Sequence, residues 1–366
     1  MNPLVIAVGT LCLMNIGLAL LLVIADAFIT DTDDRVITIN GSKKVTVAGG
    51  RPLLTSLKDQ QIFIPSACGG RGSCGLCKVA VLEGGGTILP TEIPWLTADE
   101  QKNQVRLSCQ VKVRRDLSIR IPEALFSVRQ YQAEVTEVVD LTHDIKQVTL
   151  SLIEPTTITF AAGQYVQIEV PPYELTDDTV YRAYSVASDP IRTDRIELEI
   201  RYVPKGICTT YVHQRLKVGD QITLNGPYGE FGLKATDREI ICIAGGSGMA
   251  PIRAILLEMA RTHNPRPCRY FFGARSKIDL FLVDEMRRLE SEIPNFRFIP
   301  ALSSPDPADG WEGETGLITD VVGRHVPDAS QAEAYLCGSP LMIDACIRVL
   351  REKGMPSESI FYDKFS

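Results

Sequence analysis

Hydrophobic and polar positions follow different patterns along successive parts of this 366-residue chain. Residues 3–25 form an uncharged stretch dominated by Leu, Val, Ile and Ala. Apolar and polar residues then alternate with a period of two over parts of 31–122 and of 128–234. From residue 239 onwards, short continuous apolar runs alternate with helical patterns. These changes predict a membrane segment followed by three soluble domains.

The N-terminal stretch is long enough to cross a bilayer as a helix. Such a helix needs about 20 mostly apolar residues, and the first 25 residues carry no charged side chain. A cleaved signal peptide is the competing interpretation, but the basic region that begins such peptides is absent. We therefore expect a retained single-pass anchor over residues 3–28. The basic residues that follow favour a cytoplasmic location for the soluble part: Lys43, Lys44 and Arg51.

The two regions with a period of two predict mainly β-strands. In the first domain, 31–124, Gly-rich loops separate the expected strands at 35–39, 44–47 and 117–121. In the second domain, 128–234, turn residues separate four strands, as in an antiparallel barrel. These four strands are expected at 133–139, 147–152, 165–170 and 196–202.

The third domain, 237–366, has the pattern of a doubly wound α/β fold. An apolar run at 240–244 is followed by Gly-rich sequence and by a helical pattern at 252–261. Alternation of buried strands with helices predicts a parallel sheet that is covered on both faces. The complete chain is thus expected to be a multidomain protein with α+β and α/β parts. Further buried strands are expected at 270–273, 297–299 and 333–336.

Composition and charge exclude several classes of protein. With 45% hydrophobic and 23% charged residues, the chain is typical of globular proteins and not of disordered ones. Its net charge of −7 argues against nucleic-acid binding through phosphate contacts, which needs a basic surface. The four histidines are scattered without the spacing of metal ligands, so we expect no zinc site made from them.

Four cysteines have the spacing of an iron–sulfur site. Cys68, Cys74 and Cys77 form a C-x5-C-x2-C pattern, and Cys109 follows further along the chain. Four thiolates suit the two irons of a [2Fe–2S] cluster, and the intervening glycines let the loop turn its N–H groups towards sulfur. A zinc site would usually show two close cysteine pairs, and disulfides would need an oxidising compartment. The pattern therefore favours a [2Fe–2S] cluster with these four metal ligands.

Two short runs in the second domain indicate a flavin site. R-A-Y-S at 182–185 lies just before a predicted strand, and G-I-C-T-T at 206–210 opens a helical stretch. They resemble the flavin motifs of the ferredoxin–NADP reductase superfamily, although a four-residue match can arise by chance. The resemblance implies FAD, with Arg182 on its diphosphate, Tyr184 along the ribityl chain and Ser185 near flavin N5. The implied FAD-binding residues are Arg182, Ala183, Tyr184, Ser185, Gly206, Cys208, Thr209 and Thr210.

Three Gly-containing loops in the third domain indicate a nicotinamide nucleotide site. Each follows a predicted strand, and ligands of open α/β sheets bind at the carboxyl ends of the strands. Glycines there let the backbone approach a diphosphate at a helix N-terminus. Any one of these loops could be an ordinary turn, but the three occur in the order of the superfamily. The expected residues are Gly245, Gly246, Gly248, Met249, Ala250, Pro251, Gly273, Arg275, Cys337 and Gly338.

Two further predictions concern which nicotinamide nucleotide binds and which residue lies near its nicotinamide ring. A 2′-phosphate needs several cationic partners, whereas Arg275 and Lys277 have acidic neighbours, so NADH is favoured over NADPH. The superfamily resemblance places Cys337 near the nicotinamide.

In its order of domains the whole chain resembles the F subunit of the Na+-translocating NADH:quinone reductases. The C-x5-C spacing is closer to that family and to vertebrate-type ferredoxins than to plant-type ferredoxins, and the resemblance implies a β-grasp-like ferredoxin fold for the first domain. In the family a C-terminal aromatic residue covers the flavin, and Phe365 matches it, unless this side chain simply packs on the sheet. Ser185, Cys337 and Phe365 would then position the reactants. The segment between Pro172 and Tyr181 is shorter than in typical members.

The resemblance implies an enzyme that oxidises NADH by hydride transfer to FAD. Single electrons would pass through the [2Fe–2S] cluster to integral membrane redox subunits and finally to a quinone, within a complex that translocates ions. The chain would be anchored in the inner membrane, with its soluble domains in the cytoplasm. Two alternatives are a reductase component that feeds an oxygenase, and a relay subunit without catalytic activity.

Overall fold

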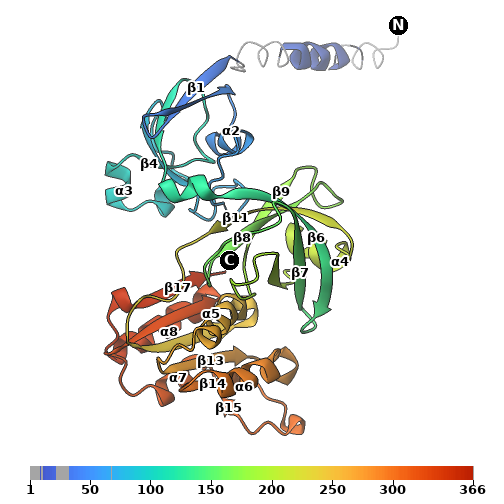
Figure 1. Ribbon diagram of the computed structural model, residues 1–366. Helices are drawn as coiled ribbons and strands as arrows, with labels where there is room; N and C mark the ends of the chain where they lie inside the picture. Colours follow the sequence, from blue (N-terminus) through green and yellow to red (C-terminus); the bar gives the residue numbers. More distant parts are fainter. Residues whose placement is uncertain (1–8, 10, 22–32, 67, 366) are drawn as a thin grey trace. The chain divides into compact units, whose positions relative to one another are not determined.

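The computed structural model describes residues 9, 11–21, 33–66 and 68–365 (Figure 1). The chain divides after Ser127 into two compact units, which we describe separately. Residues 11–21 are helical, and their large apolar side chains are exposed. Within the described residues, no helix has both the length and the apolar character that a membrane span requires. The remainder of the predicted anchor lies outside the described residues, so the anchor stays a prediction.

The first unit contains a five-stranded mixed sheet with the strand order β2-β1-β5-β3-β4. Its first and last strands in sequence, β1 and β5, are parallel neighbours, and Ile37 pairs with Leu117. Helix α2 buries Leu53 and Leu57 in the core of this unit. The expected strands are therefore present, whereas the two helices were not predicted. The elements are β1 (Asp34–Ile39), β2 (Lys43–Ala48), α2 (Leu53–Asp59), β3 (Lys78–Glu83), α3 (Ala98–Lys102), β4 (Val105–Leu107) and β5 (Leu117–Arg120).

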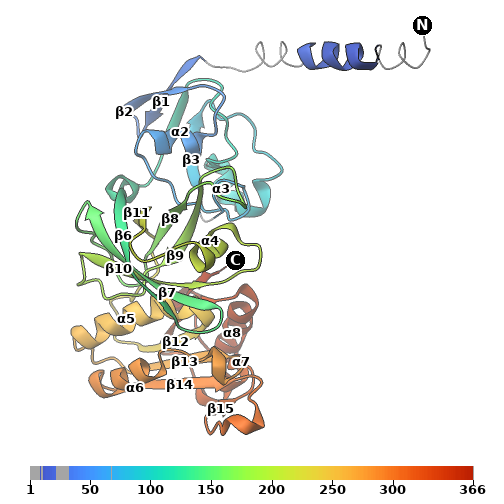
Figure 2. The same ribbon diagram turned by 90° about the vertical axis from the view of Figure 1, so that its right-hand side faces the viewer.

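The second unit begins with a six-stranded antiparallel sheet with the order β10-β7-β6-β11-β8-β9 (Figure 2). A bridge between Val186, which follows β9, and Leu198 of β10 joins its two outer strands, so the sheet closes as a barrel. The R-A-Y-S run was expected just before a strand, but it lies inside β9, where it pairs with β8. The elements are β6 (Arg129–Asp140), β7 (Ile145–Glu154), β8 (Tyr165–Val170), β9 (Val180–Ser185), β10 (Arg195–Arg201), α4 (Ile207–Gln214) and β11 (Gln221–Tyr228).

The same unit continues into a parallel sheet with the order β15-β14-β13-β12-β16-β17. Helices α5 and α6 pack in the core on one face, and α7 and α8 pack on the other, which confirms the doubly wound fold. The C-terminal strand β17 was not predicted. The elements are β12 (Glu239–Gly245), α5 (Met249–Arg261), β13 (Cys268–Ala274), α6 (Val283–Glu292), β14 (Phe296–Leu302), β15 (Glu314–Thr315), α7 (Ile318–His325), β16 (Ala332–Gly338), α8 (Pro340–Glu352) and β17 (Ile360–Lys364).

Candidate functional site

The four predicted cluster ligands meet as two pairs of sulfur atoms in the first unit. The Cys77 thiol donates to the Cys109 sulfur at 3.3 Å, and Cys74 forms the corresponding bond with Cys68. Through these bonds Cys74 lowers the pKa of Cys68 to about 4, and Cys77 lowers the pKa of Cys109 to about 7. The same bonds raise the pKa of the donors Cys74 and Cys77, so each pair shares a proton that must leave before both of its sulfurs bind iron as thiolates.

The backbone around these sulfurs is shaped to face negative charge. Four glycines of the loop have positive φ, a conformation that side chains rarely allow. The backbone N–H of Ser73 donates to Cys68, and that of Gly72 donates to Cys109. Such N–H groups stabilise the charge of a thiolate-bound cluster. The glycines are Gly69, Gly70, Gly72 and Gly75.

The two pairs of sulfurs fit the ligand set of a two-iron cluster. Within the described part of the chain, no group of three or more His, Cys, Asp or Glu side chains is arranged to hold one ion. A [2Fe–2S] cluster instead takes two protein ligands on each iron. The pairs Cys68–Cys74 and Cys77–Cys109 match that requirement.

The flavin motif places three side chains on strand β9. Arg182 is half-buried, and its Nη1 donates to the backbone oxygen of Tyr181 at 2.8 Å. The hydroxyl of Tyr184 is enclosed, and burial raises its pKa. Ser185 is buried at the end of the strand. A guanidinium has five N–H donors in a planar fork, which suits a phosphate group.

The second flavin motif forms the N-terminus of helix α4, and Gly206 occupies its N-cap position. The Thr209 hydroxyl is already engaged with the backbone of Val203 and Gly206. The Thr210 hydroxyl, in contrast, is buried and has no hydrogen-bond partner among the described residues. A buried polar atom without a partner is costly, so a group that reaches Thr210 would satisfy it. Cys208 packs instead among apolar side chains that include Val170 and Val180.

The Gly-containing loops of the parallel sheet meet at one edge. Gly245 at the end of β12 pairs with Gly273 of β13. A Cβ atom on Gly248 would lie 2.3 Å from the backbone oxygen of Cys337, at the end of β16. Gly338 has a φ of +140°, which favours glycine. The three loops therefore form a closely packed backbone surface at the carboxyl ends of the strands, where a dinucleotide can approach.

The other expected residues lie around the same edge. Met249, Ala250 and Pro251 are buried in the first turn of α5, whereas Arg275 is exposed. The Cys337 side chain is fully buried, and burial raises the pKa of its thiol, which stays neutral at physiological pH. The backbone N–H of Phe365 donates to the oxygen of Gly338 at 2.9 Å. The C-terminal aromatic residue is thereby held at the nucleotide edge.

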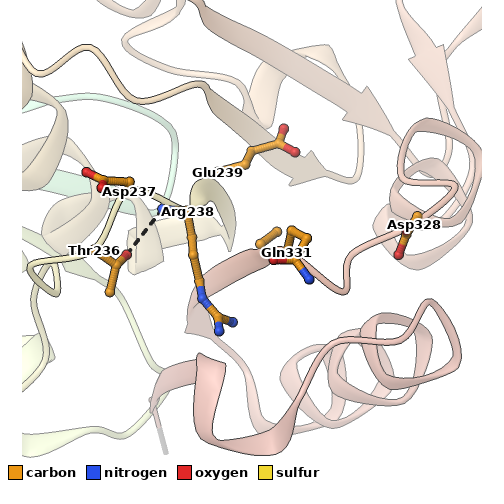
Figure 3. Close-up of a pocket in the computed structure, with 7 residues that line it drawn as sticks. Thr236, Asp237, Arg238, Glu239, Asp328 and Gln331 are labelled. Atoms are coloured by element: carbon orange, nitrogen blue, oxygen red, sulfur yellow. Dashed lines mark hydrogen bonds between the residues drawn. The ribbon is translucent and has the colours of Figure 1, made fainter.

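A pocket of about 550 Å³ opens at the opposite edge of this sheet (Figure 3). Its lining includes Glu239 and Ala332, the first residues of β12 and β16. Figure 3 shows the side chain of Arg238 among the residues that line the pocket, and the backbone N–H of Arg238 donates to the hydroxyl of Thr236. This pocket is separated from the predicted cofactor residues by the length of the strands.

Charged residues connect the barrel to the nucleotide-binding domain. Arg253 of α5 pairs with Glu197 of β10 at 2.5 Å and with Glu285 of α6 at 3.0 Å. Glu199 lies two residues further along β10, and its carboxylate oxygens are buried with no hydrogen-bond partner in the described part of the chain. Burial raises the pKa of Glu199 to about 8. The hydroxyl of Tyr270 on β13 is likewise buried without a partner among the residues that the structure describes.

Comparison with known proteins gives a family match within each of the three predicted domains. The chain matches a 2Fe-2S iron-sulfur cluster binding domain over residues 37–114, an oxidoreductase FAD-binding domain over 132–232 and an oxidoreductase NAD-binding domain over 242–348. It is 37% identical to the F subunit of the Na(+)-translocating NADH-quinone reductase of Neisseria meningitidis, over 95% of this chain and 96% of that protein. The chain belongs to this F-subunit family.

Another relative from this family and two solved structures support the same domain organisation. The F subunit of Pseudomonas aeruginosa is 36% identical, over 98% of both chains. The Amycolatopsis cytochrome P450 reductase GcoB has a TM-score of 0.73 at 29% identity, covering 90% of this chain and 98% of its own. The ferredoxin reductase of carbazole 1,9a-dioxygenase has a TM-score of 0.70 at 29% identity, and the match covers 91% of this chain and 99% of the reductase chain. The resemblance to the F subunit that was stated from the sequence is therefore confirmed, despite the shorter segment after Pro172.

Two residues of this family member were missed by sequence reasoning. Glu199 alternates with apolar residues along β10, a pattern that is also typical of a solvent-exposed face. Arg201 of the barrel lies beside the nucleotide loop, because a Cβ on Gly246 would be 3.3 Å from the Nη1 of Arg201. Only the packing of the two domains distinguishes these positions from ordinary surface charges.

The buried carboxyl group predicts a pH-dependent stability. The folded chain holds Glu199 protonated, whereas an unfolded carboxyl ionises near pH 4.5. This contribution to stability is therefore complete below pH 4.5 and is lost as the pH rises towards 8. Each pKa unit corresponds to about 1.4 kcal/mol, so the loss is on the order of a few kcal/mol.

Glu199→Gln should abolish this loss, because an amide does not ionise. We expect the variant to unfold at a higher temperature than the native chain at pH 9, with a smaller difference at pH 5. Glu137→Gln on an exposed part of β6 is the matched control and should leave the pH profile unchanged. Parallel melting profiles of the native chain and Glu199→Gln across this range would contradict the assignment.

Proposed function

We propose that this chain is the electron-input subunit of a membrane redox complex that oxidises NADH and ultimately reduces a quinone. When bound, NADH supplies a hydride, FAD converts two-electron into one-electron transfer, and the [2Fe–2S] cluster carries single electrons. The observation that carries the proposal is 37% identity to a named F subunit over 95% of the chain. Integral membrane redox subunits would receive the electrons, and no nucleic acid is involved.

The barrel residues would hold and orient FAD. Arg182 can offer guanidinium donors to the diphosphate, and the N-terminus of α4 can offer backbone N–H groups. Thr210 supports this assignment because its buried hydroxyl has no partner within the described residues. Tyr184 and Ser185 would lie along the flavin. The hydroxyl of Thr209 is engaged elsewhere, so we assign to Thr209 only a backbone contribution.

The nucleotide edge would bind NADH through backbone close to its diphosphate. Gly245 and Gly246 leave this backbone partly exposed, whereas the buried Gly248 lets the loop pack against the backbone of Cys337, and Gly273 borders the loop. Cys337 would pack as a neutral thiol beside the nicotinamide. The preference for NADH is supported by the acidic residues that accompany Arg275 and Lys277 in the sequence, since they disfavour a 2′-phosphate.

The C-terminal aromatic residue would cover the flavin ring where the two cofactors meet. This assignment of Phe365 is supported by its backbone hydrogen bond to Gly338, which fixes the end of the chain at the nucleotide edge. Phe365 would then have to move aside when the nicotinamide approaches the flavin, because both rings need the same face.

We further propose that residues 3–28 anchor the chain in the inner membrane, with the soluble domains in the cytoplasm. The uncharged N-terminal sequence supports this, as do the exposed apolar side chains of the helical residues 11–21. Residues 1–25 carry no charged group of their own, so ion translocation would depend on the partner subunits. We assign the domain limits as 31–124 for the cluster, 128–234 for FAD and 237–366 for NADH.

Deleting residues 1–32 tests the proposed function. We expect the shortened chain to keep its flavin and cluster spectra and its reduction of ferricyanide by NADH. Quinone reduction in membranes that contain the partner subunits should fall sharply, because the anchor supplies a high local concentration. Undiminished quinone reduction by the shortened chain would contradict the anchor.

A second candidate function is a membrane-tethered reductase component for an oxygenase. It is favoured by the two structural neighbours, a cytochrome P450 reductase and the ferredoxin reductase of a dioxygenase, at TM-scores of 0.73 and 0.70. The same membranes discriminate between the candidates. Full-length chain that reduces no quinone there, but does reduce an added oxygenase, would replace the first proposal by the second.

A further inference from the structure

A glutamine side chain contacts one of the predicted cluster ligands. Gln110 follows Cys109 directly, at the end of a turn in which its backbone N–H donates to Leu107 at 2.8 Å. The side chain is half-buried, and its Nε2 donates to the Cys109 sulfur, with 3.5 Å between nitrogen and sulfur. Its Oε1 accepts a hydrogen bond from the Thr91 hydroxyl at 3.0 Å.

Two further features fix the orientation of this amide. A thiolate that binds iron has no proton to donate, so it favours the amide N–H over the amide oxygen as its neighbour. The Thr91 hydroxyl stabilises the opposite end of the amide. Gly72 provides the space, because a Cβ at that position would lie 2.7 Å from Gln110 Nε2, and its φ of +75° favours glycine.

The sulfur of Cys109 therefore receives two N–H groups of different origin. One is the backbone N–H of Gly72, a part of the loop itself. The other belongs to the Gln110 side chain, which can be changed without altering the cysteine pattern or the loop. Hydrogen bonds to ligand sulfurs stabilise the more negative, reduced form of a cluster and so raise its reduction potential.

We propose that Gln110 is a positioning residue that raises the reduction potential of the [2Fe–2S] cluster by donating its amide N–H to Cys109. Thr91 acts through Gln110 by holding the amide in place. The inference rests on the proposed cluster ligands. It adds a side chain that sets how readily the cluster accepts an electron, and it involves no proton transfer.

The test is a redox titration of the full-length chain, followed by the cluster's electron paramagnetic resonance signal. Gln110→Leu removes the donor at similar volume. The hydrogen bond is stronger to the more negative reduced cluster than to the oxidised one, so without it the ratio of reduced to oxidised cluster should fall by up to about tenfold at a fixed potential. Tenfold corresponds to about 59 mV for one electron. Gln110→Glu should shift the potential further in the same direction, because it adds a negative charge.

Thr91→Val and Gln60→Leu complete the experiment. Thr91→Val leaves the contact between Gln110 and Cys109 in place but frees the amide, so it should give a smaller negative shift. Gln60→Leu makes the same chemical change at an exposed glutamine that bonds to Thr46 in the same unit, and should not shift the potential. If Gln110→Leu fails to assemble a cluster, the Thr91→Val shift decides the question.

Equal potentials for the native chain, Gln110→Leu and Thr91→Val would overturn the inference while leaving the proposed function intact. Absence of the cluster signal from the native chain would instead contradict the ligand assignment on which both rest. Reduction of ferricyanide by NADH should remain unchanged in all variants, since it needs only the FAD and NADH sites.

Discussion

Cys74→Ala should remove the [2Fe–2S] cluster and abolish electron transfer to quinone, while FAD stays bound at its normal level. The substitution leaves Cys68 without the sulfur that pairs with it, so one iron would lose half of its protein ligands. The residues proposed to hold FAD and NADH lie in the other structural unit. Reduction of ferricyanide by NADH should therefore persist.

Iron content, visible absorbance and the two activities check this expectation. Cys346→Ala is the control, because it removes a buried thiol from helix α8 without touching any predicted cofactor residue. Its iron content and quinone reduction should match those of the native chain. Quinone reduction at the native rate by a Cys74→Ala chain that lacks the cluster absorbance would refute the proposed order of electron transfer.

Gly248→Ala should strongly weaken NADH binding and leave the FAD content unchanged. The new Cβ would meet the backbone oxygen of Cys337 at 2.3 Å, a contact that can be relieved only by moving the nucleotide loop or the end of β16. Overpacking of this kind typically lowers the free energy of unfolding by about 1–3 kcal/mol. If that cost falls on the loop that binds the diphosphate, KM for NADH should rise about tenfold or more.

Gly323→Ala makes the same change inside helix α7, where the added Cβ would be 3.8 Å from Val349, an ordinary contact. Since alanine favours helices over glycine by up to about 1 kcal/mol, this control should be at least as stable as the native chain, with unchanged kinetics. Steady-state kinetics and flavin absorbance of both variants give the comparison. An unchanged KM in Gly248→Ala would remove Gly248 from the NADH site.

Motif spacing predicted the cofactors of this chain because it reports local chemistry. C-x5-C-x2-C brings sulfurs together within one loop, whatever surrounds it. The sequence likewise predicted the helix that follows Gly206. It placed the R-A-Y-S run just before a strand, however, whereas the run lies inside β9. The short sequence around Arg182 and Tyr184 is compatible with either a strand or a loop. Only its pairing with β8 shows that it is a strand.

The residues that sequence reasoning missed depend on contacts between distant segments. Glu199 is buried where α5 packs against β10 through Arg253 and Glu197, and nothing in its own strand indicates that packing. The position of Gln110 became informative only when the fold brought Thr91 and Gly72 next to it. The N-terminal anchor is a different case, since its support is still the sequence itself.

The pairing of β1 with β5 has a consequence for the order in which parts of the chain can form. Contacts between strands far apart in sequence must wait until both have been synthesised. The sheet that supports the cysteine loop therefore cannot close until Leu117–Arg120 has left the ribosome, and its five strands all belong to the first unit. Domains generally fold as units, N-terminal first, during synthesis. All residues of this sheet and of its cysteine loop are thus synthesised before the residues proposed to bind FAD.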